Sequence, residues 1–93
     1  MKYVVNTVWS HPNDIDWDRM KEGLDQLRDD EGSADEVTWY EIDPTTHGSV
    51  AVYSSQEKYE KYKSKLEEYR KDATDEIGAQ IINEFQGLVK ASI

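Results

Sequence analysis

The sequence predicts an α+β fold in which four antiparallel strands form one sheet and two helices cover one of its faces. Three observations support this prediction. Residues Val37–Ser54 have the composition of a β-hairpin, two other segments carry helical apolar stripes, and short apolar segments near both ends suit further strands. A chain of 93 residues is the size of one small domain, which we expect to span residues 1–93.

The first predicted strand is Lys2–Ser10. Its residues alternate between two sides, with Tyr3, Val5, Thr7 and Trp9 on one side and Val4, Asn6 and Val8 on the other. His11-Pro12-Asn13 ends the strand, because proline lacks the N–H that a ladder requires.

The first helix follows, with Asp14 or Asp16 as its N-cap. Its apolar side chains recur at steps of three and four and make one stripe, namely Trp17, Met20, Leu24 and Leu27. The run Asp29–Ser33 stops the helix, and Gly32 is its expected C-terminal residue.

In the hairpin, the turn residues Asp43–Gly48 separate two strands, and Gly48 is expected to supply a left-handed residue that closes the loop. The expected register places Ile42 opposite Val50, Tyr40 opposite Val52 and Trp39 opposite Tyr53. One face then carries Ile42, Tyr40, Val50 and Val52, and the other carries Val37, Trp39, Ala51 and Tyr53. Neither face is polar, which indicates that two layers cover the sheet.

The second helix begins at a capping box, Ser54-Ser55-Gln56-Glu57. Its stripe is Tyr59, Tyr62, Leu66 and Tyr69. We expect the helix to break and restart near Asp72–Thr74, with further helical turns that bury Ile77, Ile81, Ile82 and Phe85 and end at Gly87. Residues Leu88–Ile93 are then the fourth strand.

The element order is therefore β-α-β-β-α-β. Short connections and right-handed crossovers favour a sheet of strand order 4-1-3-2 with both helices on one face. The helical stripes suffice for that face only, so the other apolar face needs a different cover.

In element order and length the chain resembles the small dimeric α+β barrel proteins, a ferredoxin-like group that includes antibiotic-biosynthesis-type monooxygenases. The resemblance rests on the strand Tyr3–Trp9, the stripe Trp17–Leu27, the hairpin Val37–Ser54, and a long second helix before a final strand. It implies a homodimer whose sheets pack face to face. It also implies a ligand cleft between sheet and helices, often without a metal or cofactor. No catalytic motif matches, so the catalytic residues are unassigned.

Composition limits the partners. The formal net charge of −9 repels phosphate backbones and anionic membrane surfaces, so we expect neither nucleic acid nor membrane as a partner. The chain has no cysteine, which removes thiolate metal sites. The apolar run Tyr3–Trp9 is too short to span a membrane, and a cytoplasmic protein is expected.

The two histidines are the first site candidates. In the predicted topology, His11 and His47 lie at the same end of the sheet, with Asp14 and Asp43 nearby. Two imidazoles and two carboxylates could form a divalent metal site or an acid–base pair. Neither histidine follows a metal-binding spacing, so two exposed loop histidines are the expected state and no metal is predicted.

The aromatic residues are the second candidates. Trp9, Trp39, Tyr53 and Tyr3 could line a pocket for a flat organic ligand, with Asn6 or Thr7 as a polar group. The alternative, which we favour, is that these aromatic residues fill the core of the dimer.

The acidic series Asp14, Asp16 and Asp18 imitates the start of a calcium loop. Arg19 stands where that loop needs glycine and Asp25 where it needs glutamate, so helix capping is the better explanation. The leading function is a small-molecule-binding protein or a cofactor-independent monooxygenase-like enzyme. The alternative is a non-enzymatic dimerisation or accessory module without a ligand pocket.

Overall fold

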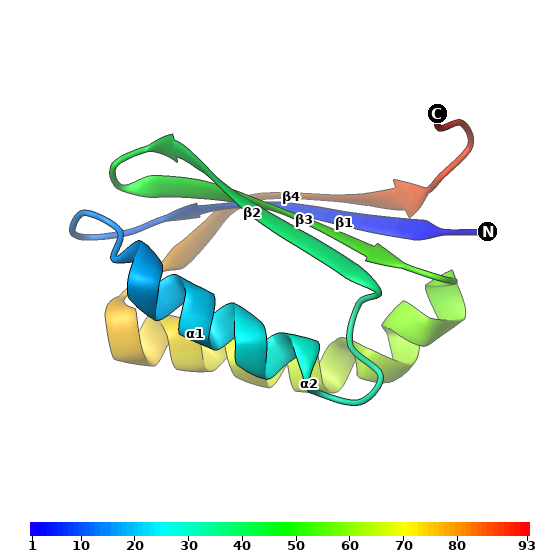
Figure 1. Cartoon of the computed structure of the whole chain (residues 1–93), viewed down its shortest axis with the longest axis horizontal. Helices are drawn as coiled ribbons and strands as arrows, with labels where there is room; N and C mark the ends of the chain where they lie inside the picture. Colours follow the sequence, from blue (N-terminus) through cyan, green and yellow to red (C-terminus); the bar gives the residue numbers. More distant parts are fainter.

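The computed structural model describes all residues 1–93 and shows two layers, a four-stranded antiparallel sheet and two helices on one of its faces (Figure 1). The elements are β1 (Tyr3–Ser10), α1 (Trp17–Arg28), β2 (Glu36–Asp43), β3 (Thr46–Tyr53), α2 (Gln56–Ile77) and β4 (Gln80–Leu88). The sheet order is β2-β3-β1-β4, which is 4-1-3-2 when it is counted from the β4 edge. The predicted α+β class with one antiparallel sheet is confirmed, and it fits a ferredoxin-like fold. Neither helix has the length and apolar character needed to cross a membrane.

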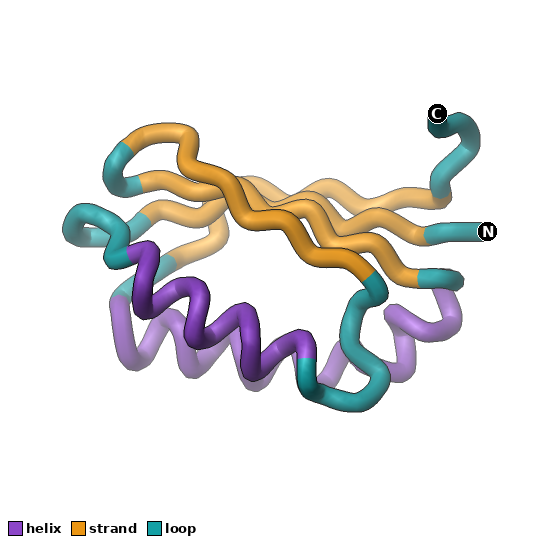
Figure 2. The backbone as a smooth tube through the Cα atoms, viewed as in Figure 1, coloured by secondary structure: helices purple, strands orange, loops and turns teal.

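Strand β1 is central and alternates as predicted. Tyr3, Val5, Thr7 and Trp9 are buried and the residues between them are half-buried. The buried side chains point to the helix layer, which Figure 2 shows beneath the sheet as two purple segments. The opposite face of the sheet, called the open face below, has no element over it.

The hairpin register differs from the predicted one. Trp39 lies opposite Ser49 and Tyr40 opposite Gly48, four residues away from the expected partners. The reason is the turn, which contains only Pro44 and Thr45. Asp43 Oδ1 accepts a hydrogen bond of 2.9 Å from the Thr45 N–H, which stabilises this tight turn. Because the difference is an even number of residues, each side chain keeps its predicted face.

Gly48 is therefore a strand residue and does not close the loop. Its φ is not positive; only Gly32 and Gly78 have positive φ. The Tyr40 ring lies directly over the Gly48 backbone, where a Cβ would overlap two ring carbons and the hydroxyl oxygen of Tyr40. The glycine is thus required by close packing across the two strands.

Helix α1 begins after Asp16, whose side chain accepts hydrogen bonds from the N–H groups of Asp18 and Arg19. The helix ends at Arg28 with Asp29 as its C-cap, so the expected end at Gly32 is wrong. Gly32 instead has φ 84° in the loop that follows. None of the α1 residues is buried, so this helix lies loosely on the sheet.

Helix α2 runs unbroken over 22 residues, and the predicted interruption near Asp72 is wrong. Ser55, one residue beyond the start of the predicted capping box, is the N-cap, and Gly78 at φ 70° ends the helix. Strand β4 then covers Gln80–Leu88, so the predicted final strand Leu88–Ile93 is also wrong. The spacing of Ile77, Ile81 and Phe85 imitates a helix, but the left-handed Gly78 separates the first from the others.

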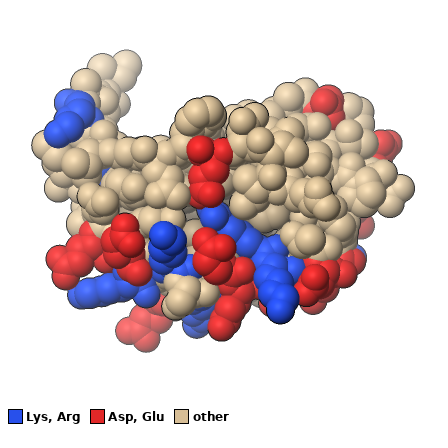
Figure 3. Space-filling view, turned by 180° about the vertical axis from the view of Figure 1, so that it is seen from behind, with Lys and Arg blue, Asp and Glu red and all other residues tan.

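The chain keeps its charges away from the open face. Figure 3 shows most charged side chains over the helix layer, while the sheet side is largely free of them. The apolar residues of the open face include Tyr40, which is 42% exposed, and Phe85, which is 67% exposed. Phe85 belongs to this face because it pairs with Asn6, and Glu84 beside it bonds to α2 on the other side. The buried core lies on the helix side, in a cluster of Tyr3, Val5, Tyr53, Tyr59 and Tyr62.

Candidate functional site

A cleft of about 300 Å³ separates the sheet from the two helices. It exists because small residues face one another across the two layers. Ser49 and Ala51 of β3 face it from the sheet, and Gly23 of α1 and Ala73 of α2 face it from the helices. A Cβ added to Gly23 would meet no atom within 4 Å, so the layers leave real space here. The volume lies at the lower end of the range for small-molecule pockets.

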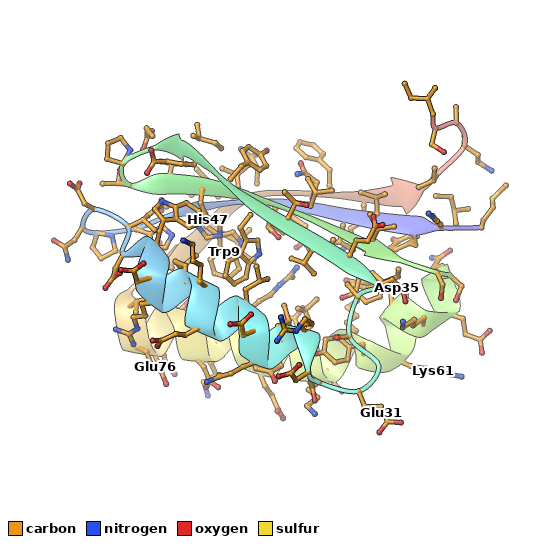
Figure 4. The ribbon with its side chains drawn as sticks, in the orientation of Figure 1. Trp9, Glu31, Asp35, His47, Lys61 and Glu76 are labelled. Carbon is orange, nitrogen blue, oxygen red and sulfur yellow. The ribbon has the colours of Figure 1, made fainter.

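The end of the cleft near the β2–β3 turn is aromatic and encloses His47. The His47 ring is stacked on Trp9 at 6.0 Å between centroids with an interplanar angle of 8°. Trp39 lies 5.7 Å away in a tilted arrangement, and Trp17 at the start of α1 is edge-on at 6.2 Å. Figure 4 shows His47 and Trp9 on the helix side of the sheet, close to the first turn of α1. Only 3% of His47 is exposed.

His11 and His47 form a pair. His11 Nε2 lies 2.7 Å from His47 Nδ1, and the ring centroids are 5.0 Å apart. β1 ends just before His11 and β3 carries His47, so the antiparallel pairing of these strands brings the rings together. The expectation of two exposed loop histidines is wrong. The short turn places His47 within β3, where its side chain lies on the same face as those of Ser49 and Ala51 and points to the helices.

Burial determines the protonation of the pair. Loss of hydration, and secondarily the charge of His11, lowers the pKa of His47 from 6.5 to about 4. Burial also lowers the pKa of His11. Both rings are therefore neutral near pH 7, and one N–H is shared in the bond between them.

Three other polar side chains of the cleft already have partners within the protein. Thr7 Oγ1 accepts a hydrogen bond of 3.0 Å from the Trp9 indole N–H. Arg19 of α1 lies 3.7 Å from Glu76 of α2, an ion pair that joins the two helices. Arg70, whose side chain is 13% exposed, donates to Glu84 at 2.9 Å. The cleft thus presents apolar walls, hydroxyl groups and imidazoles, and its cations are neutralised.

The opposite end of the helix–sheet interface is closed by tyrosines. Tyr53 is 1% exposed and burial raises its pKa to about 12. Asp30 accepts hydrogen bonds from the hydroxyls of Tyr62 and Tyr69 and pairs with Lys65 at 2.6 Å. These contacts tie the end of α1 to α2 and are explained by packing.

Of the predicted pocket residues, five line the cleft: Trp9, His11, Trp39, His47 and Tyr53. Asn6 does not, because its even position in β1 lies on the open face, where its amide donates to the Ser49 carbonyl at 3.0 Å. Of the two polar residues named as candidates, Asn6 and Thr7, only Thr7 lines the cleft. The favoured alternative for the aromatics is wrong: Tyr3, Trp9 and Tyr53 are buried on the helix side, so they are not available to a dimer core on the open face.

The predicted acidic partners of the histidines do not join them. Asp43 bonds to Thr45 in the turn, and no group of three or more His, Asp or Glu side chains could hold a metal ion. Sequence reasoning missed Trp17 as a neighbour of His47. Trp17 lies in the first turn of α1, three residues before Met20 in the apolar stripe, and was therefore interpreted only as a packing residue.

Comparison with known proteins gives a fold and no family. No family model matches the chain, and no curated protein matches its sequence. A solved structure described as the structural-genomics protein YJCS is similar, with a TM-score of 0.66 over 97% of this chain and 100% of that chain. The two sequences are 10% identical, so this similarity establishes the shared fold alone.

Proposed function

We propose that this protein binds a small, flat aromatic or carbonyl compound in the cleft between sheet and helices. The cleft with its indole-lined histidine is the observation that carries the proposal. Binding sites for such compounds combine apolar aromatic walls with a few placed polar groups, and this cleft has both. The resemblance to cofactor-independent monooxygenase-like proteins adds the expectation that the bound compound is chemically changed there.

The ligand is expected to be neutral. Arg19 and Arg70 are each held by a carboxylate, so neither is free to bind an anion without breaking an ion pair. The net charge of −9 adds long-range repulsion of anions. An uncharged planar compound is favoured by contact with Trp39 and Trp9.

Binding of 2-tetralone, a neutral bicyclic ketone, tests the proposal through the change in tryptophan fluorescence. Ala51→Phe places a ring in the cleft and is expected to weaken binding by at least about tenfold, since the loss of about 1.4 kcal/mol suffices for that factor. Lys61→Phe is the matched control, because Lys61 is exposed on α2 and does not line the cleft. Equal binding by wild type and Ala51→Phe would place the ligand elsewhere and refute the proposal.

The second part of the proposal is a ferredoxin-like homodimer through the open face. Tyr40, Val50 and Val52 form an apolar surface there together with Val4, Val8 and Phe85. The charged residues Glu36 and Asp43 stand at the two ends of β2. Two copies of the chain can therefore pair through this face with little electrostatic repulsion, although the chain as a whole is strongly acidic. An exposed apolar face of this kind marks an interaction surface, and a twofold pairing buries identical patches.

Sedimentation equilibrium tests the dimer. The wild-type chain is expected to have twice the monomer mass at micromolar concentration, and Phe85→Glu is expected to shift it to monomer. Lys61→Glu on the exposed side of α2 is the control and should leave the mass unchanged. A wild-type chain that is monomeric at about 100 µM would sink this part. A monomer would also contradict the alternative function as a dimerisation module. The proposal that a ligand binds in the cleft would be unaffected.

A further inference from the structure

His47 offers one free nitrogen to the cleft. Its Nδ1 is occupied by His11 Nε2 at 2.7 Å, and its Nε2 makes no hydrogen bond with the protein. Every fully buried side-chain nitrogen or oxygen in the protein has a hydrogen-bond partner. The unpaired Nε2 is therefore not fully buried. Since His47 lines the cleft, Nε2 is the atom that a bound ligand can reach.

His11 continues the path outward. It follows the end of β1 and is only half-buried, so its second nitrogen, Nδ1, lies on the route to solvent. The bond between the rings can be made in two ways: either His11 donates to His47 or His47 donates to His11. In the first case His47 Nε2 carries a proton, and in the second it is free to accept one.

We propose that His47 and His11 form a proton relay that takes a proton from a neutral carbonyl compound in the cleft and delivers it to solvent. The inference rests on the proposed function, because the ligand must occupy the cleft. His47 is the catalytic base, and His11 is a positioning residue that removes the proton from His47.

The net change is the transfer of one proton from the ligand to water, which takes place as three proton transfers along the relay and moves no heavier atom. The bond between the ligand's α-carbon and its hydrogen breaks, and His47 Nε2 takes the proton while the electron pair moves onto the carbonyl oxygen as an enolate. His47 Nδ1 passes its own proton to His11 Nε2, and His11 Nδ1 releases a proton to water. Both rings end neutral in the other tautomer, and the reverse sequence returns a proton to carbon.

The surroundings favour a relay over a single charged imidazolium. The charged groups that share the cleft with the two rings are Arg19 on α1 and Arg70, Asp72 and Glu76 on α2, and Glu41 lies opposite His47 across the hairpin. Arg19 and Glu76 neutralise each other, and Glu41 accepts from the Trp17 indole at 3.1 Å. No carboxylate touches either ring to hold a positive charge. Burial keeps the pKa of His47 low, so a proton that it accepts must move on quickly.

Deuterium exchange at the C1 position of 2-tetralone, followed by proton NMR in D2O, tests the relay. Wild type is expected to accelerate exchange over buffer by about 100-fold or more, a typical general-base effect. His11→Gln carries the test, because a glutamine amide can still hydrogen-bond His47 Nδ1 but cannot pass a proton on. We expect about a tenfold slower exchange in this variant with an unchanged dissociation constant. His47→Gln is expected to fall to the buffer rate.

The two proposals fail in different ways. If 2-tetralone binds but exchanges no faster than in buffer, or if His11→Gln exchanges as fast as wild type, the relay is refuted and the binding function stands. If 2-tetralone does not bind, both proposals are refuted for this class of ligand. A loss of binding in His11→Gln, in a variant whose circular dichroism is unchanged, would make His11 a structural residue and overturn its role in the relay.

Discussion

Lowering the pH from about 7.5 to about 4.5 should destabilise this protein through His47. Its pKa is lowered from 6.5 to about 4 in the folded chain, so the unfolded chain binds more protons between these values. The stabilising contribution of neutral His47 is therefore complete above about pH 6.5 and is lost as the pH falls towards 4. At about 1.4 kcal/mol per pH unit, the loss between pH 7.5 and 4.5 is about 2.5 kcal/mol.

Other groups add little in this interval. His11 acts in the same direction, because burial lowers its pKa too. Asp30, Asp35 and Asp43 have lowered pKa values, chiefly through hydrogen bonds from Lys65, Lys58 and Thr45. Since their ordinary value is 3.8, their contribution is lost mainly below about pH 4. The window between 4.5 and 6.5 consequently reports on the histidines.

Urea unfolding followed by circular dichroism measures this dependence. Wild type is expected to lose about 2.5 kcal/mol or somewhat more between the two pH values, which is a large part of the stability of a small domain. His47→Gln removes the titrating ring, so most of this pH dependence should disappear, whatever its stability at pH 7.5. An equal loss in wild type and in His47→Gln would refute the argument that burial controls the protonation of His47.

Two further predictions concern the backbone that positions the cleft. Gly48→Ala should lower the free energy of unfolding by about 1–3 kcal/mol, because the new methyl overlaps the Tyr40 ring. Gly87→Ala, in a strand position with no neighbour within 4 Å, should change it by less than about 0.5 kcal/mol, and equal effects in urea unfolding would contradict the packing described. Asp16→Ala should lower the free energy of unfolding by about 1 kcal/mol, because it removes the N-cap of α1. Asp14→Ala should leave it nearly unchanged. A larger loss for Asp14→Ala in thermal unfolding would show that Asp14, not Asp16, caps the helix.

The local patterns were sufficient for most elements. Alternation in β1 and the three-four spacing in α1 and the first half of α2 predicted elements that the structure contains. The even-numbered error in hairpin register left every side chain on its predicted face, so Trp39 and Tyr53 were correctly predicted to share a face, although they do not lie opposite each other. The C-terminal quarter was predicted wrongly. The steps of four between Ile77, Ile81 and Phe85 suit one continuous helix, but Ile77 ends α2 whereas Ile81 and Phe85 belong to β4. Gly78, in its left-handed conformation, was the signal that distinguishes them.

By itself the sequence determined the class of fold, since the period of apolar residues and the caps are properties of a few neighbouring residues. It also determined that the sheet has two apolar faces. Only the tertiary structure decided that His47 is buried among tryptophans and bonded to His11, and that the cleft stays open beside them. Those facts depend on the length of one turn and on the pairing of β1 with β3, which bring together residues 36 positions apart. Contacts over such distances are set by packing of the whole chain, and no local pattern contains them.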